Sequence, residues 1–398
     1  MISIVKSKQK KIIEKSIEIA LGSSSHGIPN MFRNDKTCIK LMWIMLFLTG
    51  TSMGIYTCVN SIFSYFNYEV VTSINVINEI PTEFPAITFF IQRNNKVKIS
   101  LNKLINECKF NTLSCNVIEN YFKTNKDKYG FISYTFKNEN AFLGGKFFAL
   151  SVSLNLENIT FDNGSIYDGI RLIIHNSSYD SNYYTGASPN GFNLETGFKY
   201  EISIKKIFTY KLGQPYNNCL KDVESRDSFD SDLYRYILKS TNYSYRQEDC
   251  FMYYVGRELY KHFNGSNKID RWENIVFEYP SYSDYLNIIY QNIINNKIYK
   301  VYESECPLEC DSIKYEISHS FNKFSIKNET SSSSERVQFS VYYEKPEYTV
   351  IDQIAQMTVF DLISNIGGNL GLFIGISFLS FAELIELLVE IIFIIFNL

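Results

Sequence analysis

The sequence predicts a membrane protein in which two transmembrane helices flank a large, β-rich α+β extracellular domain. Two long apolar runs stand near opposite ends of the 398-residue chain. Six cysteines and six Asn-X-Ser/Thr sequons all fall between these runs. Several segments between the runs also alternate apolar and polar residues, as half-buried strands do.

The first apolar run has no Asp, Glu, Lys or Arg from Leu41 to Tyr68. Its first part is long and apolar enough to cross a bilayer core of ~30 Å. We therefore predict a transmembrane helix over residues 41–66. A buried core helix is the alternative for one such run, and the second run at the other end of the chain counts against it.

Residues 1–40 form a polar, basic tail without the apolar region of a cleavable signal peptide. The tail carries eight Lys or Arg and three acidic residues, so the positive-inside rule predicts that it is cytoplasmic. Two crossings then return the C-terminus, residues 397–398, to the cytoplasm. Residues 67–357, between the crossings, are expected outside the cell.

The cysteines of this exterior are even in number, as expected of disulfides in an oxidising compartment. Their spacing alone selects no pairing, and Cys306 and Cys310 lack partners at metal-ligand spacing, so we expect no metal site. The cysteines expected to form disulfides are Cys108, Cys115, Cys219, Cys250, Cys306 and Cys310. The predicted glycosylation acceptors are Asn158, Asn163, Asn176, Asn242, Asn264 and Asn328.

Period-two alternation predicts strands in the exterior, and helical spacing is rarer there. The expected strands cover residues 84–90, 147–156, 169–175, 199–212 and 336–344. Helices are expected over 282–300 and near 115–121, and a polar loop over 331–334.

The second apolar segment, residues 358–396, is free of charge from Leu362 to Ala382. As one helix from Leu362 to Phe396 it would be ~52 Å long, which exceeds the bilayer core. We therefore expect it to tilt strongly, to break or to project from the membrane. Four glycines permit a break or a close helix approach: Gly367, Gly368, Gly371 and Gly375.

Three carboxylates follow at Glu383, Glu386 and Glu390, on one face of a helix. An ionised carboxylate at mid-membrane costs ~2.5–3.5 kcal/mol on insertion scales, so it should face water. In a symmetric oligomer each position becomes a ring that attracts cations. The other interpretation is an amphipathic helix end at the cytoplasmic interface. One chain with two spans cannot enclose a pore, so a channel requires several subunits.

Other classes of function receive no support from the sequence. The net charge of −3 does not favour nucleic-acid binding. No nucleophile–base constellation or metal motif is present, and His175, His262 and His319 are isolated. We predict neither catalytic residues nor a cofactor; the expected ligand of the pore is the permeant sodium ion.

Several motifs resemble the epithelial sodium channel/degenerin superfamily, which includes acid-sensing and peptide-gated channels. The run FDLISNIGGNLGLFIGISFLSFAELIELL resembles its second membrane segment, and CPLECDSIKYEISHS resembles its CPxxC-containing strand. FPAITFF resembles its FPAVT motif, and HGIPNMF, with His26 and Gly27, resembles its cytosolic HG gating motif. The resemblance covers about residues 26–390.

The resemblance implies a homotrimer or heterotrimer whose subunits each have a hand-like exterior of palm, β-ball, finger, knuckle and thumb. Residues Gly375, Ile376 and Ser377 would form the selectivity filter, and Gly371 would match the site of amiloride block. Ser364 would match the degenerin position, where a small residue lets the gate close.

The resemblance also implies contacts in the exterior. Tyr68 and Tyr216 would meet at the wrist and link thumb movement to the first helix. Cys219 would pair with Cys310, and Cys250 with Cys306. Cys108 and Cys115 would close a short finger loop.

Two further disulfides of the family lose both partners here: Phe90 and Ser133 replace one pair, and Tyr254 and Ser304 the other. Ile376 is bulkier than the residue that the family prefers in the filter. Val70 replaces the histidine of acid-sensing members, which argues against gating by protons of that kind.

We expect a pore-forming subunit of a sodium-permeable, amiloride-sensitive channel in the plasma membrane, gated by an extracellular stimulus. Its expected partners are identical or sibling subunits, the lipid bilayer, sodium ions and an extracellular ligand, and not nucleic acid. The alternative is a two-pass adhesion or receptor glycoprotein, or an accessory subunit, that conducts no ions.

Overall fold

A computed structural model represents the chain, and it divides the chain into two compact units. The terminal unit comprises residues 1–71 and 355–398, and the central unit comprises residues 72–354. The structure describes residues 17–18, 21–22, 27–33, 36–91, 101–115, 118–126, 132–136, 139–157, 169–178, 191–240, 244–251, 253–254, 257, 304–324, 335–375 and 377–396. The helix expected over 282–300 and the loop expected over 331–334 lie outside these residues.

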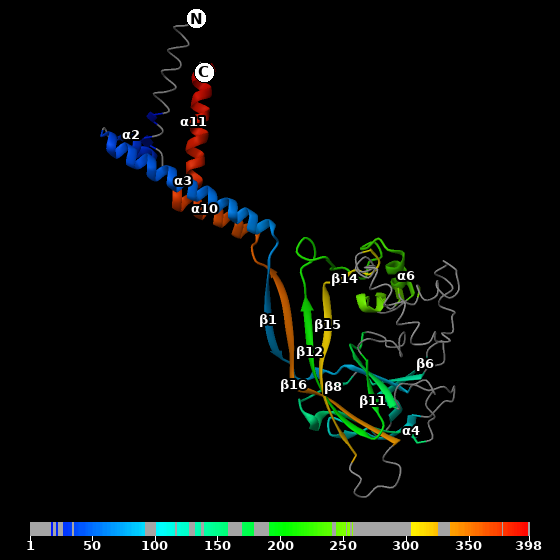
Figure 1. Cartoon of the computed structure of the whole chain (residues 1–398). Helices are drawn as coiled ribbons and strands as arrows, with labels where there is room; N and C mark the ends of the chain where they lie inside the picture. Colours follow the sequence, from blue (N-terminus) through cyan, green and yellow to red (C-terminus); the bar gives the residue numbers. More distant parts are fainter. Residues whose placement is uncertain are drawn as a thin grey trace, which may run out of the picture. The chain divides into compact units, whose positions relative to one another are not determined.

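The terminal unit contains the helices α2 (Ile28–Arg33), α3 (Thr37–Phe66), α10 (Val359–Ile374) and α11 (Phe378–Phe396). Helix α3 begins at Thr37, four residues before the predicted start at residue 41, and includes Lys40. Helix α10 runs alongside α3 (Figure 1). Among the described residues, α3 is the one helix whose length and composition suffice for a membrane crossing.

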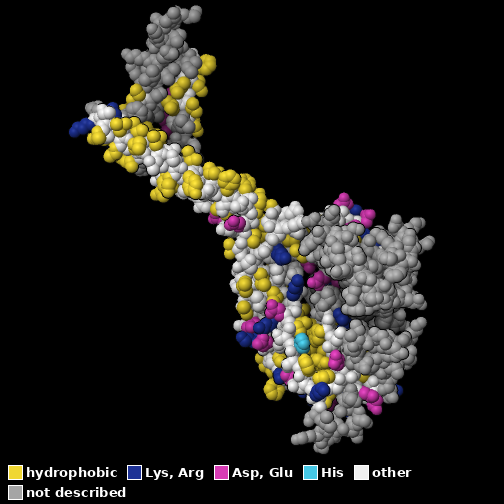
Figure 2. Space-filling view, viewed as in Figure 1, with side chains coloured by type: hydrophobic (Ala, Val, Ile, Leu, Met, Phe, Trp, Pro, Cys, Tyr) yellow, Lys and Arg dark blue, Asp and Glu magenta, His cyan; other side chains and the backbone are white. Residues whose placement is uncertain are grey.

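Helix α3 carries hydrophobic side chains on its surface along its length (Figure 2). Its polar residues are accommodated within the helix itself. The hydroxyls of Thr51, Ser52 and Ser61 each donate to the carbonyl oxygen one turn earlier, at 2.7–3.0 Å. Such bonds satisfy a polar group where no water is available. A largely apolar helix can therefore contain hydroxyl residues.

The second apolar segment is not one helix. Helix α10 begins with a capping box, in which the Thr358 side chain accepts from the Asp361 N–H and the Asp361 side chain accepts from the Thr358 N–H. It ends at Gly375, and α11 starts at Phe378. Of the three outcomes expected for this overlong segment, the structure has the break.

The central unit is built on two sheets. The seven-stranded sheet has the order β15-β12-β16-β9-β4-β5, with β1 also pairing with β16, and the five-stranded sheet has the order β11-β10-β3-β7-β6. The strands of the first sheet are β1 (Val70–Asn78), β4 (Ile105–Phe110), β5 (Leu113–Ser114), β9 (Leu150–Asn155), β12 (Phe198–Tyr210), β15 (Asp311–Lys323) and β16 (Arg336–Ala355). Those of the second are β3 (Ala86–Ile91), β6 (Phe122–Lys126), β7 (Ile132–Phe136), β10 (Gly169–His175) and β11 (Gly191–Glu195).

Smaller elements complete the described part of this unit. Two short strand pairs are β2 (Thr82–Glu83) with β8 (Asn140–Ala141), and β13 (Cys219–Leu220) with β14 (Leu308–Glu309). The helices are α4 (Leu101–Leu104), α5 (Ile118–Tyr121), η1 (Lys146–Phe148) and α6 (Asp232–Ser240). The five segments with period-two alternation form β3, β9, β10, β12 and β16, and α5 lies in the segment where a short helix was predicted.

Aromatic side chains fill the main core of the central unit. Phe89 is fully buried and its ring lies 5.4 Å from that of Tyr134 and 5.9 Å from that of Phe339. Phe84 packs edge-to-face against Phe136 and also against the ring of Tyr343, at 5.8 Å. Residues from both sheets contribute to this core, so period-two alternation in each sheet produces one shared interior.

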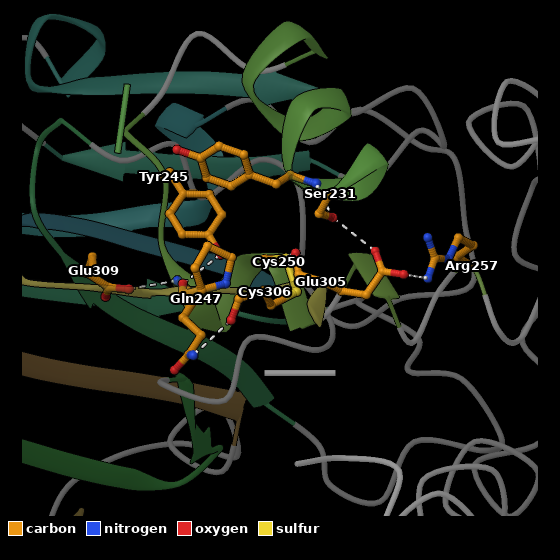
Figure 3. The surroundings of a disulfide bond; sticks show 10 residues. Ser231, Tyr245, Gln247, Cys250, Arg257, Glu305, Cys306 and Glu309 are labelled. Atoms are coloured by element: carbon orange, nitrogen blue, oxygen red, sulfur yellow. Dashed lines mark hydrogen bonds and ion pairs between the residues drawn. A yellow bond between two sulfur atoms is a disulfide. The ribbon is translucent and has the colours of Figure 1, made fainter. Parts of the chain in front are cut away.

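A second, smaller core forms beside α6 and is rich in tyrosine. The rings of Tyr234 and Tyr245 lie 4.9 Å apart and pack in one cluster with Cys250 and Cys306. Tyr245 lies close to the disulfide between these cysteines (Figure 3). The Tyr245 hydroxyl donates to the Pro307 carbonyl oxygen at 2.9 Å. Each buried tyrosine hydroxyl in this pair has a partner, since Tyr234 donates to the Val223 carbonyl oxygen at 3.0 Å.

Three disulfides join Cys108 to Cys115, Cys219 to Cys310, and Cys250 to Cys306. This is the pairing that the family resemblance implies. Phe90 and Ser133, which replace one family disulfide, are opposite each other in the β3–β7 ladder. The positions of that lost disulfide are therefore neighbours, as a cysteine pair would require.

Candidate functional site

The break in the second apolar segment is produced by Gly375. Its backbone has φ 72° and ψ 20°, the left-handed conformation that ends many helices and favours glycine. Its N–H donates to the Gly371 carbonyl oxygen at 3.0 Å, which holds it in the last turn of α10. Ile376, the next residue of the predicted filter, lies outside the described residues.

Ser377 and Ser380 define the start of α11. The Ser377 N–H donates to the Ser380 hydroxyl at 3.0 Å, and the Ser380 N–H donates to the Ser377 carbonyl oxygen at the same distance. The first backbone groups of a helix lack partners within it, and this exchange satisfies two of them. Ser377 itself is exposed. Sequence reasoning missed Ser380, although a serine three residues after Ser377 was a signal for it.

Ser364 and Gly371, the predicted gate and blocker residues, are both exposed on α10. With Gly368 and Gly375 they recur at helical spacing along one face of the segment. A Cβ atom built on Gly368 would meet no described atom within 4 Å. This face is therefore lined by small residues and is uncovered in the single chain.

The three predicted pore carboxylates all lie on α11. Glu386 is exposed, and Glu383 and Glu390 are partly buried. Their spacing places them along one side of this helix, with the apolar residues of α11 around them. The structure thus separates the filter residues, at the break, from the carboxylates, which follow in the helix after it.

Helices α3 and α10 meet at two glycines that sequence reasoning did not select. A Cβ atom built on Gly50 would lie 2.7 Å from the Phe373 carbonyl oxygen, and one on Gly54 would lie 3.4 Å from the Phe373 Cβ. Gly54 is the buried residue of α3. The signal was present, because Gly50-X-X-X-Gly54 is the small-residue spacing that lets membrane helices approach closely.

Gly27 of the HG motif is described, whereas His26 lies outside the described residues. Gly27 is buried, with φ 100°, and its carbonyl oxygen accepts from the Met31 N–H at 3.2 Å. A Cβ atom there would lie 3.5 Å from the Phe47 ring on α3. The positive φ gives a physical reason for glycine at this position.

Tyr68 and Tyr216 belong to different units, so the wrist contact stays a prediction. Tyr68 has φ 51°, an unusual value for a tyrosine, directly after α3. Its ring lies 6.3 Å from that of Tyr65. The Tyr216 N–H donates to the Gly213 carbonyl oxygen at 3.0 Å.

A buried lysine in the central unit is paired with a glutamate near the surface. The Lys206 side chain is 4% exposed, and its Nζ lies 3.0 Å from the Glu83 carboxylate and 5.0 Å from the Phe208 ring centroid. Burial raises the pKa of the Glu83 carboxyl, but the hydrogen bond and charge of Lys206 outweigh burial and hold this pKa below its ordinary value.

Carboxyls near the tyrosine-rich core shift in the opposite direction. Burial raises the pKa of Asp249, although Arg246 forms two hydrogen bonds of 2.7 Å with it. Burial also raises the pKa of Glu309, which accepts from the Gln247 N–H at 2.9 Å (Figure 3). Burial raises the pKa of Tyr234 to about 12.

Asn176 is the predicted glycosylation acceptor that lies within the described residues. It is 8% exposed, and its side-chain oxygen accepts from the Ser178 N–H and the Ser178 hydroxyl, each at 3.1 Å. The other predicted acceptors, Asn158, Asn163, Asn242, Asn264 and Asn328, lie outside the described residues.

When the chain is compared with known protein families, the model of the amiloride-sensitive sodium channel family matches residues 20–89 and 90–387. The degenerin unc-8 of Caenorhabditis elegans is 24% identical, over 75% of this chain and 40% of its own length. The human bile acid-sensitive ion channel is 20% identical, over 93% of this chain and 85% of its own length. The epithelial sodium channel alpha subunit of Pelodiscus sinensis is 25% identical, over 73% of this chain and 47% of its own length.

The chain thus spans less than half the length of the degenerin and of the epithelial channel subunit, and most of the bile acid-sensitive channel. Among solved structures, a cryo-EM structure of a proton-activated chloride channel shares 8% identity with a TM-score of 0.40, over 89% of this chain and 98% of that one. A similarity of this size supports no argument about function.

Proposed function

Because the chain belongs to the amiloride-sensitive sodium channel family, we propose that it is a pore-forming subunit of a trimeric, sodium-permeable cation channel. Amiloride blocks it, and an extracellular stimulus opens it. The observation that carries the proposal is the left-handed Gly375, which interrupts an apolar segment two residues before Ser377. Non-helical backbone at membrane depth is tolerated only where it is buried in protein or lines water.

The second crossing consists of α10, the break and α11 together. Helix α10 has 16 residues and α11 has 19, so they are ~24 Å and ~28 Å long at about 1.5 Å per residue. Since the bilayer core is ~30 Å thick, α10 alone is too short to cross it. The break therefore lies within the membrane, where backbone groups from three subunits can replace water around a dehydrating cation.

The carboxylates of α11 supply the electrostatic part of the pathway. In a trimer, Glu383, Glu386 and Glu390 each form a ring of three negative charges. Such rings concentrate cations and repel anions at the mouth of a pore. They follow the break in the chain, so cations that pass the filter next meet these rings. In this arrangement the channel lies in the plasma membrane, and both chain termini lie in the cytoplasm.

Chain connectivity offers a route from the exterior to the pore. Strand β1 begins four residues after α3 ends, and α10 begins four residues after β16 ends. The two strands pair with each other. The short connections from strand to helix are also bonded, because the Gln356 N–H, between β16 and α10, donates to the carbonyl oxygen of Glu69, between α3 and β1, at 2.9 Å. A stimulus that shifts this strand pair therefore moves both helices, with Tyr68 and Tyr216 as the expected wrist contact.

Expression in oocytes with voltage-clamp recording tests the proposal. We expect an inward sodium current that amiloride blocks, and a constitutive current in the Ser364→Phe variant, whose bulky side chain prevents closure. A Ser364→Ala variant keeps the position small and serves as the control. The absence of current in all three, alone and with sibling subunits, despite surface labelling, would favour the non-conducting alternative.

A further inference from the structure

Helix α10 approaches α3 closely at Gly50, where a Cβ atom would lie 2.7 Å from a backbone atom of α10. The less exposed positions of α3 recur at helical spacing and include Phe47, Gly50 and Gly54. Helix α10 packs along this face through Phe373 and Ile374, the last two residues before Gly375. Lipid tails are as apolar as the helices, so close packing rather than hydrophobic burial holds such helices together.

The two glycines tolerate a methyl group very differently. At Gly50 a Cβ atom would lie 2.7 Å from the Phe373 carbonyl oxygen and 3.6 Å from its carbonyl carbon, both backbone atoms. At Gly54 the nearest atoms are side-chain atoms, the Phe373 Cβ at 3.4 Å and the Ile374 Cδ1 at 3.6 Å. An alanine at Gly54 would therefore make ordinary contacts, whereas one at Gly50 requires a backbone to move.

The backbone that would have to move belongs to the turn that ends in the filter break. The Phe373 carbonyl is two residues before Gly375, and the Gly375 N–H is bonded to the Gly371 carbonyl oxygen in the same turn. A helical turn moves as a unit because its hydrogen bonds link successive residues. A displacement of Phe373 away from α3 therefore carries Gly375 with it.

We propose that Gly50 is a positioning residue of the pore: the absence of a side chain there sets how deeply the last turn of α10 docks on α3, and thereby fixes where the Gly375–Ser377 break stands. This role rests on the proposed channel function. It acts through Phe373, and Gly50 itself need not touch a permeating ion.

The first experiment compares Gly50→Ala with Gly54→Ala, which add the same methyl group one turn apart on one helix face. Surface labelling, the Na⁺/K⁺ permeability ratio and the half-blocking amiloride concentration are measured for each. We expect about a threefold or larger change in the ratio or in block for Gly50→Ala, since coordination at a filter depends on the placement of its ligands. Gly54→Ala should stay near wild type. Wild-type selectivity and block in Gly50→Ala, or equal changes in both variants, would overturn the proposal.

The second experiment does not depend on conduction. In a chain with Cys38 and Cys58 replaced by serine, the pair Gly54→Cys and Phe373→Cys places two Cβ atoms at about the separation of a disulfide. Oxidation in membranes should protect both thiols from a maleimide reagent. Adding Gly50→Ala should slow this protection severalfold, whereas Gly22→Ala, at a position with no described neighbour within 4 Å, should not.

The two experiments separate the possible failures. If the unmodified channel passes no current but the cross-link forms and is slowed by Gly50→Ala, the proposed function fails and the docking role of Gly50 stands. If the cross-link forms at the same rate with glycine or alanine at position 50, the docking role fails whatever the currents show. If Gly50→Ala does not reach the surface, the cross-linking rate in internal membranes decides between these outcomes.

Discussion

Different contacts stabilise the inside of the terminal unit and the inside of the central unit. In the terminal unit, α10 approaches α3 so closely that Gly50 has room for no side chain, and its described cysteines, Cys38 and Cys58, are free. In the central unit, buried aromatic rings, three disulfides and an ion pair with one buried partner, Lys206, stabilise the fold. The difference follows from the solvent. Burial of apolar area stabilises a fold in water, but between helices in lipid only close contact remains.

The largest effect on the central unit should come from its aromatic core. Phe89→Ala removes a fully buried ring that contacts Tyr134 and Phe339, and we expect a loss of about 3–5 kcal/mol in the free energy of unfolding. Phe147→Ala, at a residue of the same unit that is 85% exposed, is the matched control and should change little. Thermal unfolding of the purified full-length protein measures both. Equal effects of the two would contradict this account of the core.

Removal of the Cys250–Cys306 disulfide is the next largest change. The bond closes a loop with a sequence separation of 56 residues, and its removal should cost about 3–4 kcal/mol by raising the entropy of the unfolded chain. The double variant Cys250→Ser/Cys306→Ser leaves no unpaired thiol, and protease resistance of the tyrosine-rich core reports the loss. The Gly54–Phe373 cross-link in the terminal unit should be unaffected. A reduced yield of that cross-link would show that the two units are not independent in this respect.

The ion pair between the buried Lys206 and Glu83 predicts a smaller effect. Glu83→Gln leaves the Lys206 ammonium buried with a weaker partner, and we expect a loss of about 1–3 kcal/mol. The control is Glu344→Gln, which breaks the neighbouring pair with Lys205; both of those side chains are more than half exposed, so the loss should be about 0–1 kcal/mol. Chemical unfolding of the two variants in parallel measures the difference. A larger loss from Glu344→Gln would show that burial does not govern these pairs.

The dependence of stability on pH should have opposite signs in two parts of the central unit. Asp249 and Glu309 have a raised pKa in the folded protein. Their contribution to the free energy of unfolding is therefore fully present below their ordinary pKa values of 3.8 and 4.5, and it is lost as pH rises through the folded pKa values. Glu83 has a lowered pKa in the folded protein, so its contribution to the free energy of unfolding is present above its ordinary pKa of 4.5 and is lost as pH falls through the folded pKa.

Acidification toward the ordinary pKa values of these two carboxyls should therefore increase protease resistance of the tyrosine-rich core. The double variant Asp249→Asn/Glu309→Gln should remove this gain, while Glu83→Gln should leave it in place. The prediction fails if the double variant retains the full dependence on pH.

The smallest effect concerns glycosylation. Asn176 is buried and its side-chain oxygen accepts hydrogen bonds from Ser178, so we expect the folded chain to carry no glycan there. Asn176→Gln should leave the electrophoretic mobility of the protein unchanged, before and after treatment with a glycosidase. A mobility increase equal to the loss of one glycan would show that Asn176 is modified.

Local patterns in the sequence were sufficient for much of the architecture. Helix α3 follows from a charge-free run, and the strands β3, β9, β10, β12 and β16 follow from alternation with period two. The excess length of the second apolar segment indicated a break, and its glycines indicated where a break was possible. These inferences succeed because periodicity and length are properties of contiguous residues.

Lys205 and Lys206 show what alternation leaves undecided. Adjacent residues of a strand face opposite sides, so one of these lysines had to point inward. Alternation selects Lys206, which continues the buried positions Ile202 and Ile204, but it does not say which carboxylate pairs with each lysine. The structure buries Lys206 beside Glu83 and leaves Lys205 exposed beside Glu344.

By itself, then, the sequence determined two apolar segments, a β-rich domain with cysteines and, through its motifs, a family. Only the tertiary structure decided which glycine admits a neighbouring backbone and which carboxylate pairs with the buried lysine. The physical reason is that clearance at Gly50 depends on Phe373, and the charge of Lys206 is balanced by Glu83; in each case the partner is far away in the chain. Such contacts exist only after distant segments have packed, and no local pattern of residues encodes their distances.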